Sequence, residues 1–151
     1  MKDAITIRKV STAEELQQAR EIRVRVFEEE QGFPHEVNVD GVDQAASHVL
    51  AFDGEVPVAT ARLTVVADGQ GMIARVAVLP SHRGMGFGRH LVKELETIGQ
   101  NEGLHTLCLE PHAHLEDFYH ALGYEKVAGS VEVAGHRLIR MKKEVCTLPK
   151  E

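Results

Sequence analysis

One segment constrains the fold more than any other. Residues 75–91 read RVAVLPSHRGMGFGRHL, an apolar run that passes through a glycine-rich turn into an amphipathic stretch. Glycines let a backbone wrap closely around a ligand, and the helix that follows offers unpaired N–H groups at the positive end of its dipole. Arg83 and Arg89, on the two sides of the glycines, add positive charge. The segment therefore predicts a strand–turn–helix that binds phosphate, and the alternative is a glycine-rich connection without a ligand.

Two familiar phosphate loops do not fit this segment. A Walker loop needs a Gly-Lys pair, and the chain contains none. The Rossmann fingerprint needs a glycine at 89, where Arg89 stands. The remaining pattern is R-x-x-G-x-G at 83–88, and after the strand RVAVLP it resembles the pyrophosphate loop of the GNAT N-acetyltransferases.

The resemblance implies acetyl-CoA as cosubstrate, bound by two stretches of this chain. The pantetheine arm is expected along the strand, and the amide of Val78 is expected to polarise the thioester carbonyl. The pyrophosphate is expected on residues 83–89, which we call the glycine loop. The implied cofactor-binding residues in these stretches are Val76, Ala77, Val78, Arg83, Gly84, Met85, Gly86, Phe87, Gly88 and Arg89.

Composition places the chain among small globular proteins. Its 151 residues, 43% hydrophobic, fit one domain at 1–145 followed by a tail at 146–151. The net charge of −6 argues against nucleic acid as a partner, because phosphate backbones attract a surplus of Lys and Arg. No apolar stretch has the length of a signal-peptide core or a membrane span, so we expect a cytoplasmic protein without a membrane partner.

The pattern of apolar residues predicts alternating strands and helices. We expect a strand at 5–10. A helix should follow, from a capping box at 11–14 to about Glu29, and then a loop at 32–46. Three antiparallel strands precede the glycine loop, and a helix separates the third of them from a parallel neighbour at 104–109. The order βαβββαβαββ resembles the GNAT fold, an α/β (α+β) architecture with a mixed sheet of about seven strands. The other expected elements are strands 47–52, 56–66 and 72–78, helices 86–102 and 116–122, and a hairpin of 124–133 with 136–142.

A second segment supports the same family. Residues 118–124 match F-Y-x-x-x-G-[FY], a signature that closes the acyl-CoA site in GNAT enzymes. The resemblance implies that Tyr119 contacts the cofactor and protonates the departing CoA thiolate. A phenol with a pKa near 10 is chemically suited to that step. The alternative is that Tyr119 is a packing residue beside Phe118.

Two histidines precede this signature. Many relatives carry an asparagine at the position of His112, where it contacts pantetheine, so the expected contact of His112 with the cofactor departs from the pattern. His114 is a candidate proton acceptor, because an imidazole titrates near pH 6.5, and the alternative is a partly buried residue at a helix start. An H-x-H pair can also bind metal, but no further ligands stand at a recognisable spacing, and we predict no metal.

Several residues of the sequence are candidates for the general base. A glutamate that several relatives use would stand next to Arg75, and this chain has Ala74 there. The candidates are Glu30, Glu110, His112 and His114.

Residues 28–43, which we call the acidic segment, contain six carboxylates and no Lys or Arg. Together with V-F-x-x-E-Q at 26–31, this stretch resembles a bacterial subgroup of small GNAT proteins with unassigned acceptors. We expect Glu29, Glu30 and Gln31 to border the acceptor site, where negative charge would attract a cationic amine. The alternative is a solvated acidic loop.

The sequence therefore predicts an N-acetyltransferase that moves the acetyl group of acetyl-CoA to a primary amine of a small molecule or peptide. The alternative is a non-catalytic acyl-CoA-binding sensor or interaction module of the same fold. A homodimer stays open.

Overall fold

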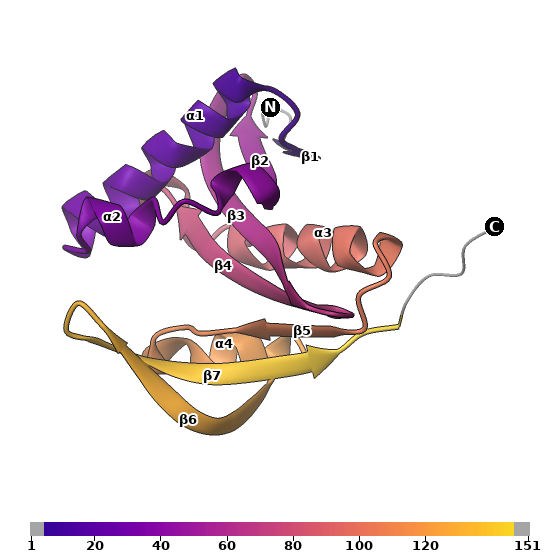
Figure 1. Cartoon of the computed structure of the whole chain (residues 1–151). Coiled ribbons are helices and arrows are strands. Elements are labelled where there is room, and N and C mark those ends of the chain that lie inside the picture. The colour runs from indigo at the N-terminus through magenta and orange to yellow at the C-terminus, as the bar shows by residue number, and fades with distance from the viewer. Residues whose placement is uncertain (1–4, 147–151) are drawn as a thin grey trace.

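The structure is a computed structural model that describes residues 5–146. Its centre is a seven-stranded mixed sheet in the order β1-β2-β3-β4-β5-β7-β6 (Figure 1). The strands are β1 (Ile5–Lys9), β2 (Ser47–Asp53), β3 (Val56–Ala67), β4 (Gln70–Val78), β5 (Thr106–Leu109), β6 (Glu125–Val133) and β7 (His136–Glu144). The helices are α1 (Ala13–Arg23), α2 (His35–Asn38), α3 (Phe87–Asn101) and α4 (Glu116–Ala121). This order confirms the predicted fold class, while the predicted tail lies, apart from Cys146, outside the described residues.

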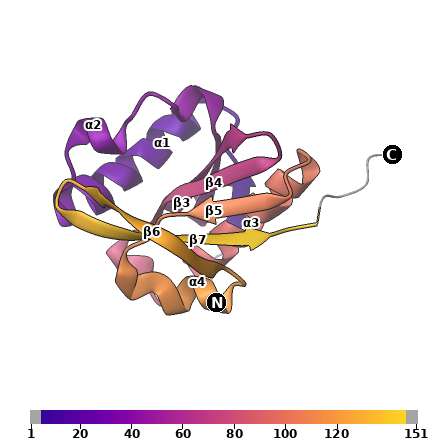
Figure 2. The same cartoon turned by 60° about the horizontal axis from the view of Figure 1, so that its bottom comes forward.

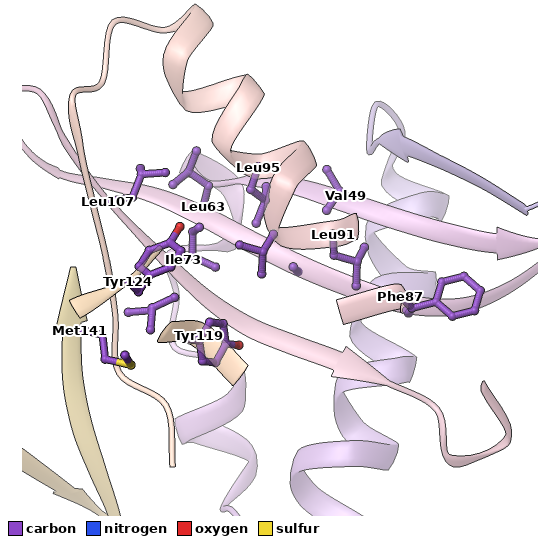
Figure 3. Packing of buried hydrophobic residues seen from close by; sticks show 14 of the residues in the cluster. Val49, Leu63, Ile73, Phe87, Leu91, Leu95, Leu107, Tyr119, Tyr124 and Met141 are labelled. Atoms are coloured by element: carbon purple, nitrogen blue, oxygen red, sulfur yellow. The ribbon is translucent and has the colours of Figure 1, made fainter. Parts of the chain in front are cut away.

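The helices cover both faces of the sheet because the strands alternate their side chains. In β2, Val49 and Ala51 belong to the core under α3, whereas Leu50 and Phe52 pack toward α1. The α3 face contributes Leu91 to the larger core, which Figure 3 shows against the sheet. The alternation of side chains along the strands thus gives the sheet two buried faces.

The N-terminal third differs from its prediction in three details. The capping residue of α1 is Thr12, which accepts from the Glu15 N–H at 3.1 Å, so the predicted box moves by one residue. The helix does not run regularly to Glu29, because Val24–Glu30 adopts π-helical winding. The predicted loop at 32–46 contains α2 and a short 3₁₀ turn, Asp43–Ala45.

The only parallel pair in the sheet, β4 with β5, is short. Its register runs from Gln70↔Thr106 to Ile73↔Leu109, as predicted for parallel neighbours, and β4 then continues to Val78 without a partner on that side. Figure 1 shows β4 and β5 diverging beyond this point, and Figure 2 shows the β6–β7 hairpin on the β5 side of the gap between them. This divergence exposes a strand edge within the fold. No helix in the described range 5–146 has the length and apolarity needed to cross a bilayer.

Candidate functional site

A cavity of about 370 Å³, which we call the cleft, lies where β4 and β5 part. Its walls come from the π-helix and the segment after it, from β4, from the chain after β5, from α4 and from the β6–β7 hairpin. Most lining side chains are apolar. The lining residues are Phe27, Gln31, Phe33, Val37, Asn38, Asp40, Arg62, Met72, Ile73, Ala74, Arg75, Val76, Leu109, Glu110, Pro111, His112, Leu115, Tyr119, Val133 and Leu138.

A β-bulge shapes the wall that β4 contributes. The register passes from Thr60↔Ala77 to Arg62↔Ala74, so β4 holds one residue more than β3 in this stretch. Arg75 takes up the excess with a φ of 57°, a left-handed conformation that is unfavourable for a non-glycine residue. The bulge turns the backbone of β4 at the cleft, so a strained residue lies at the centre of the candidate site.

The side chain of Arg75 connects the bulge to the end of α2 and to Asp40, which follows α2. Its guanidinium donates to the carbonyl oxygens of Val37 at 2.6 Å and Asn38 at 3.2 Å, and to the Asp40 carboxylate at 3.1 Å. Burial is the main reason that the pKa of Arg75 falls to about 10, so the group stays charged at neutral pH. These bonds fix the strained conformation in place.

The exposed edge of β4 presents backbone polar groups. The Leu79 N–H donates to the Val58 carbonyl at 2.9 Å, and residues of an antiparallel strand alternate in direction, so the N–H and C=O of Val78 face away from β3. The Val78 carbonyl accepts from Arg83 Nε at 2.9 Å. The Val78 N–H therefore faces the side on which β5 has parted.

The glycine loop has the backbone that the sequence predicted. Gly84 and Gly86 have φ values of 78° and 86°, and α3 begins at Phe87 without a side chain capping its first amides. A Cβ at Gly84 would meet nothing within 4 Å, so the conformation, and not packing, requires glycine there. Phe87 is buried, so its predicted cofactor contact could come only from its backbone. The amides at the start of α3 form a ready anion site.

Arg83 does not point freely into solvent. Its two terminal nitrogens donate to both carboxylate oxygens of Glu30, each at 2.6 Å. These hydrogen bonds lower the pKa of Glu30 and raise that of Arg83. The sequence placed these residues at opposite ends of the site, and the structure joins them.

A buried ionic cluster backs the cleft. Asp43, with 2% of its surface exposed, accepts from Arg20 at 3.0 Å, from Arg23 at 2.9 Å and from Arg62 at 3.1 Å. Burial alone raises the pKa of the Asp43 carboxyl, but hydrogen bonds and the charges of these arginines outweigh it and hold the pKa far below its ordinary value. No sequence motif indicated this cluster, because the three arginines are 19 to 23 residues from Asp43 along the chain.

Arginines from other elements pair with three of the six carboxylates of the acidic segment, Glu30, Asp40 and Asp43. Asp40 accepts two hydrogen bonds from Arg62, and Glu28 accepts from His35 and Asn38. Within residues 5–146, Glu29 and Glu36 are the two carboxylates of the segment that have no hydrogen-bond or ion-pair partner. Of the three residues predicted to border the acceptor, only Gln31 lines the cleft, and its Oε1 atom is buried without a partner among the described residues.

Tyr119 belongs to the core and also lines the cleft. Its ring packs edge-on against Phe118 and Tyr124, with centroids 4.9 and 6.1 Å apart, and only 5% of the residue is exposed. Figure 3 shows the hydroxyls of Tyr119 and Tyr124 pointing to different sides. In the described part of the chain the Tyr119 hydroxyl has no hydrogen-bond partner. Burial raises its pKa to about 12, so it remains a proton donor throughout the neutral range.

The two predicted histidines differ in their relation to the cleft. His112 lines the cleft, whereas the exposed His114 stacks on it with ring centroids 5.6 Å apart and is absent from the lining. No motif in the sequence pointed to His136, whose Nδ1 lies 3.1 Å from Nε2 of His112. Burial first, and then the charges of His136 and His114, lower the pKa of His112. Among residues 5–146 no three metal-binding side chains come close enough to hold an ion.

Comparison with known proteins gives consistent matches. The model of the acetyltransferase (GNAT) family matches residues 11–124. A Bacillus subtilis (strain 168) protein provisionally named an acetyltransferase is 32% identical over 143 residues, covering 93% of this chain and 97% of the relative. Among solved structures, a provisionally named N-acetyltransferase from Lactobacillus plantarum has a TM-score of 0.87 and 26% identity, covering 94% of this chain and 99% of that chain. An acyl-CoA N-acyltransferase from Pseudomonas aeruginosa has a TM-score of 0.83 and 25% identity, covering 93% and 99%.

Proposed function

The chain belongs to the GNAT acetyltransferase family, and on this premise we propose that it transfers the acetyl group of acetyl-CoA directly to a primary amine. One observation carries the proposal. The unpaired edge of β4 and Tyr119 line one cleft where the sheet opens, and the chain leads from the end of β4 through the glycine loop to the uncapped N-terminus of α3.

The donor side follows from backbone chemistry. The pyrophosphate would lie on the amides of residues 84–89, where the helix dipole and the free N–H groups favour an anion. The pantetheine amides would pair with the exposed edge of β4 as a short added strand. The acetyl carbonyl would then accept from the Val78 N–H, a donor typically worth about 3 kcal/mol when charge develops on the oxygen.

The transfer itself needs two proton movements. The neutral amine nitrogen attacks the thioester carbon, a C–N bond forms, and the C–S bond breaks as the tetrahedral intermediate collapses. The Tyr119 hydroxyl donates toward the departing sulfur, which leaves as a thiol. Before the attack, the ammonium form of the acceptor has lost one proton to a base that releases it to solvent. After the attack, the nitrogen of the intermediate loses a second proton, which replaces the one that Tyr119 donated. Starting from the ammonium form, the products are therefore the acetamide, free CoA as its thiol and one proton released to solvent.

The acceptor binds on the side of the cleft formed by Phe33, Val133 and Leu138. The charged residues of the lining are already engaged, Asp40 with Arg62 and Arg75, and Glu110 with Arg140 at 3.4 Å. Attraction of a cationic acceptor therefore rests on Glu29 and Glu36. An amine with an apolar remainder suits this cleft, because it could leave water without separating an existing ion pair.

The test is a thiol-release assay with acetyl-CoA and a panel of amines. The panel contains an aromatic monoamine, a polyamine and an amino acid, and mass spectrometry checks each amine for one added acetyl group. We expect thiol release that depends on an amine. Tight acetyl-CoA binding without amine-dependent release would favour the sensor alternative. If the polyamine is the best acceptor and a Glu29→Gln, Glu36→Gln double variant raises its KM at low salt, the acidic segment attracts the acceptor.

A further inference from the structure

Four aromatic side chains from different parts of the sequence meet at one end of the cleft. His112 follows β5, His136 begins β7, Phe33 follows the π-helix, and His114 stacks on the outer side of His112. The rings of Phe33 and His136 are stacked, with centroids 4.0 Å apart and an interplanar angle of 22°. This stack holds the His136 ring between the hairpin and the segment after the π-helix.

The backbone also holds the two imidazoles together. His112 forms an isolated β-bridge with Leu138, and the Ile139 N–H donates to the Pro111 carbonyl at 2.9 Å. These contacts attach the chain after β5 to β7 next to the histidine pair. The backbone therefore brings the two histidines together, and their rings meet with His112 Nε2 and His136 Nδ1 3.1 Å apart.

A hydrogen bond between two neutral imidazoles needs one donor nitrogen and one acceptor nitrogen. If His112 donates from Nε2, its Nδ1 carries the lone pair, and that atom has no hydrogen-bond partner among the described residues. His136 then accepts at Nδ1 and carries its own proton on Nε2. In this arrangement a proton can enter at one end of the pair and leave at the other.

The two carboxylates among the candidate bases already form ion pairs. Glu110 pairs with Arg140, and Glu30, another candidate base, pairs with Arg83. The groups that face His112 are His136 and His114. Burial first, and then the charge that either neighbouring imidazole carries when it is protonated, lower the pKa of His112 and favour its neutral form. A neutral imidazole is the form that accepts a proton.

Resting on the proposed function, we propose that His112 and His136 form a two-imidazole relay that carries the acceptor's proton from the cleft to solvent. His112 takes a proton from the amine nitrogen at Nδ1 and gives its Nε2 proton to Nδ1 of His136. His136 releases its Nε2 proton to water. Both rings end neutral in the opposite tautomer, and exchange with water resets them, so the net step moves one proton out of the cleft.

The first measurement is the pH profile of kcat/KM for the best amine of the panel. His112→Asn should lower kcat/KM by roughly 10²-fold, the usual scale for loss of a general base. His136→Phe keeps the ring stack on Phe33 but removes the acceptor. It should lower kcat/KM about tenfold or more and move the acidic limb to higher pH, because a positive neighbour that lowered the pKa of His112 is gone.

A conservative variant distinguishes a proton-relay role of His136 from a positioning role. His136→Asn offers His112 an acceptor oxygen but cannot pass a proton on, so the relay predicts no recovery. Recovery of the parental kcat/KM would overturn the relay and leave His136 as a positioning residue. His120→Asn, an exposed histidine of α4, is the matched control, and acetyl-CoA affinity should be unchanged in the two His136 variants and in this control.

A second readout does not need turnover. Long-range ¹H–¹⁵N correlation spectra of the free protein near pH 7 should show His112 protonated on Nε2, and the opposite tautomer would overturn the relay. Absence of thiol release from the parent with every amine would instead overturn the proposed function. The spectra therefore decide on the histidine pair independently of the assay.

Discussion

Arg83 and Glu30 connect the start of the glycine loop to the end of the π-helix through two hydrogen bonds of 2.6 Å each. The two residues are 53 positions apart, and both side chains are about 40% exposed, at 42% and 39%. The pair thus links the proposed donor side of the site to the element that leads into the acceptor side.

The ion pair should compete with the cofactor for Arg83. Glu30→Gln removes the carboxylate, so Arg83 becomes free to reach a phosphate, and we expect acetyl-CoA to bind up to several-fold more tightly by calorimetry. Stability should change by no more than about 1 kcal/mol, because exposed ion pairs contribute little. Glu29→Gln, at a neighbouring carboxylate, is the control. Weaker binding in Glu30→Gln alone would mean that the pair orders the loop for the cofactor.

The glycine loop can be tested with a matched pair of variants. Gly86 and Gly103 have similar φ values, 86° and 85°, at the two ends of α3. Valine at either position should destabilise the fold by at least about 1–2 kcal/mol, because an L-residue resists this conformation. Only Gly86→Val should also weaken acetyl-CoA binding, since its side chain would stand among the amides of the loop. Equal affinity in the two variants would place the pyrophosphate elsewhere.

Tyr119 and Tyr124 provide a comparison between chemistry and stability. Tyr119→Phe should leave acetyl-CoA binding near normal and lower kcat by roughly 10²-fold. Since burial raises the pKa of Tyr119 to about 12, its hydroxyl should add no basic limb to the pH profile below about pH 11.

The Tyr124 hydroxyl instead donates to Glu96 at 2.8 Å within the core. Tyr124→Phe should lower the free energy of unfolding by about 1–2 kcal/mol and leave kcat unchanged. The reverse result, with Tyr119 important only for stability, would remove it from the reaction.

Asp43 should make stability depend on acid. Its folded pKa lies below the ordinary value near 3.9, so its contribution is complete above about pH 4 and is lost as the pH falls through the folded value. Asp43→Asn should cost about 3–5 kcal/mol at pH 7, because it leaves buried arginines without their partner. Urea unfolding at pH 7 and pH 3 measures both effects. Asp68→Asn, at an exposed turn, is the control, and an equal loss in both variants would contradict the cluster's role.

Much of the fold could be predicted from the sequence because it depends on local rules. Alternation and helical periodicity placed the seven strands and the three longer helices, and the crossover of α3 required β4 and β5 to be parallel. The patterns missed two features of the N-terminal third, the π-helical winding at 24–30 and the four residues of α2. The end of α2 is held by a distant residue, because Arg75 of β4 donates to the carbonyl oxygens of Val37 and Asn38.

The sequence by itself determined the glycine loop and the position of Tyr119, because a left-handed backbone demands glycine and a short signature fixes the tyrosine on its helix. Only the tertiary structure decided which charges cancel and which imidazoles meet. Arg83 with Glu30, Asp43 with Arg23, and His112 with His136 are pairs from distant elements. Such side-chain partners depend on how distant elements are placed relative to one another in the folded protein. The spacing of residues along the chain does not determine that placement.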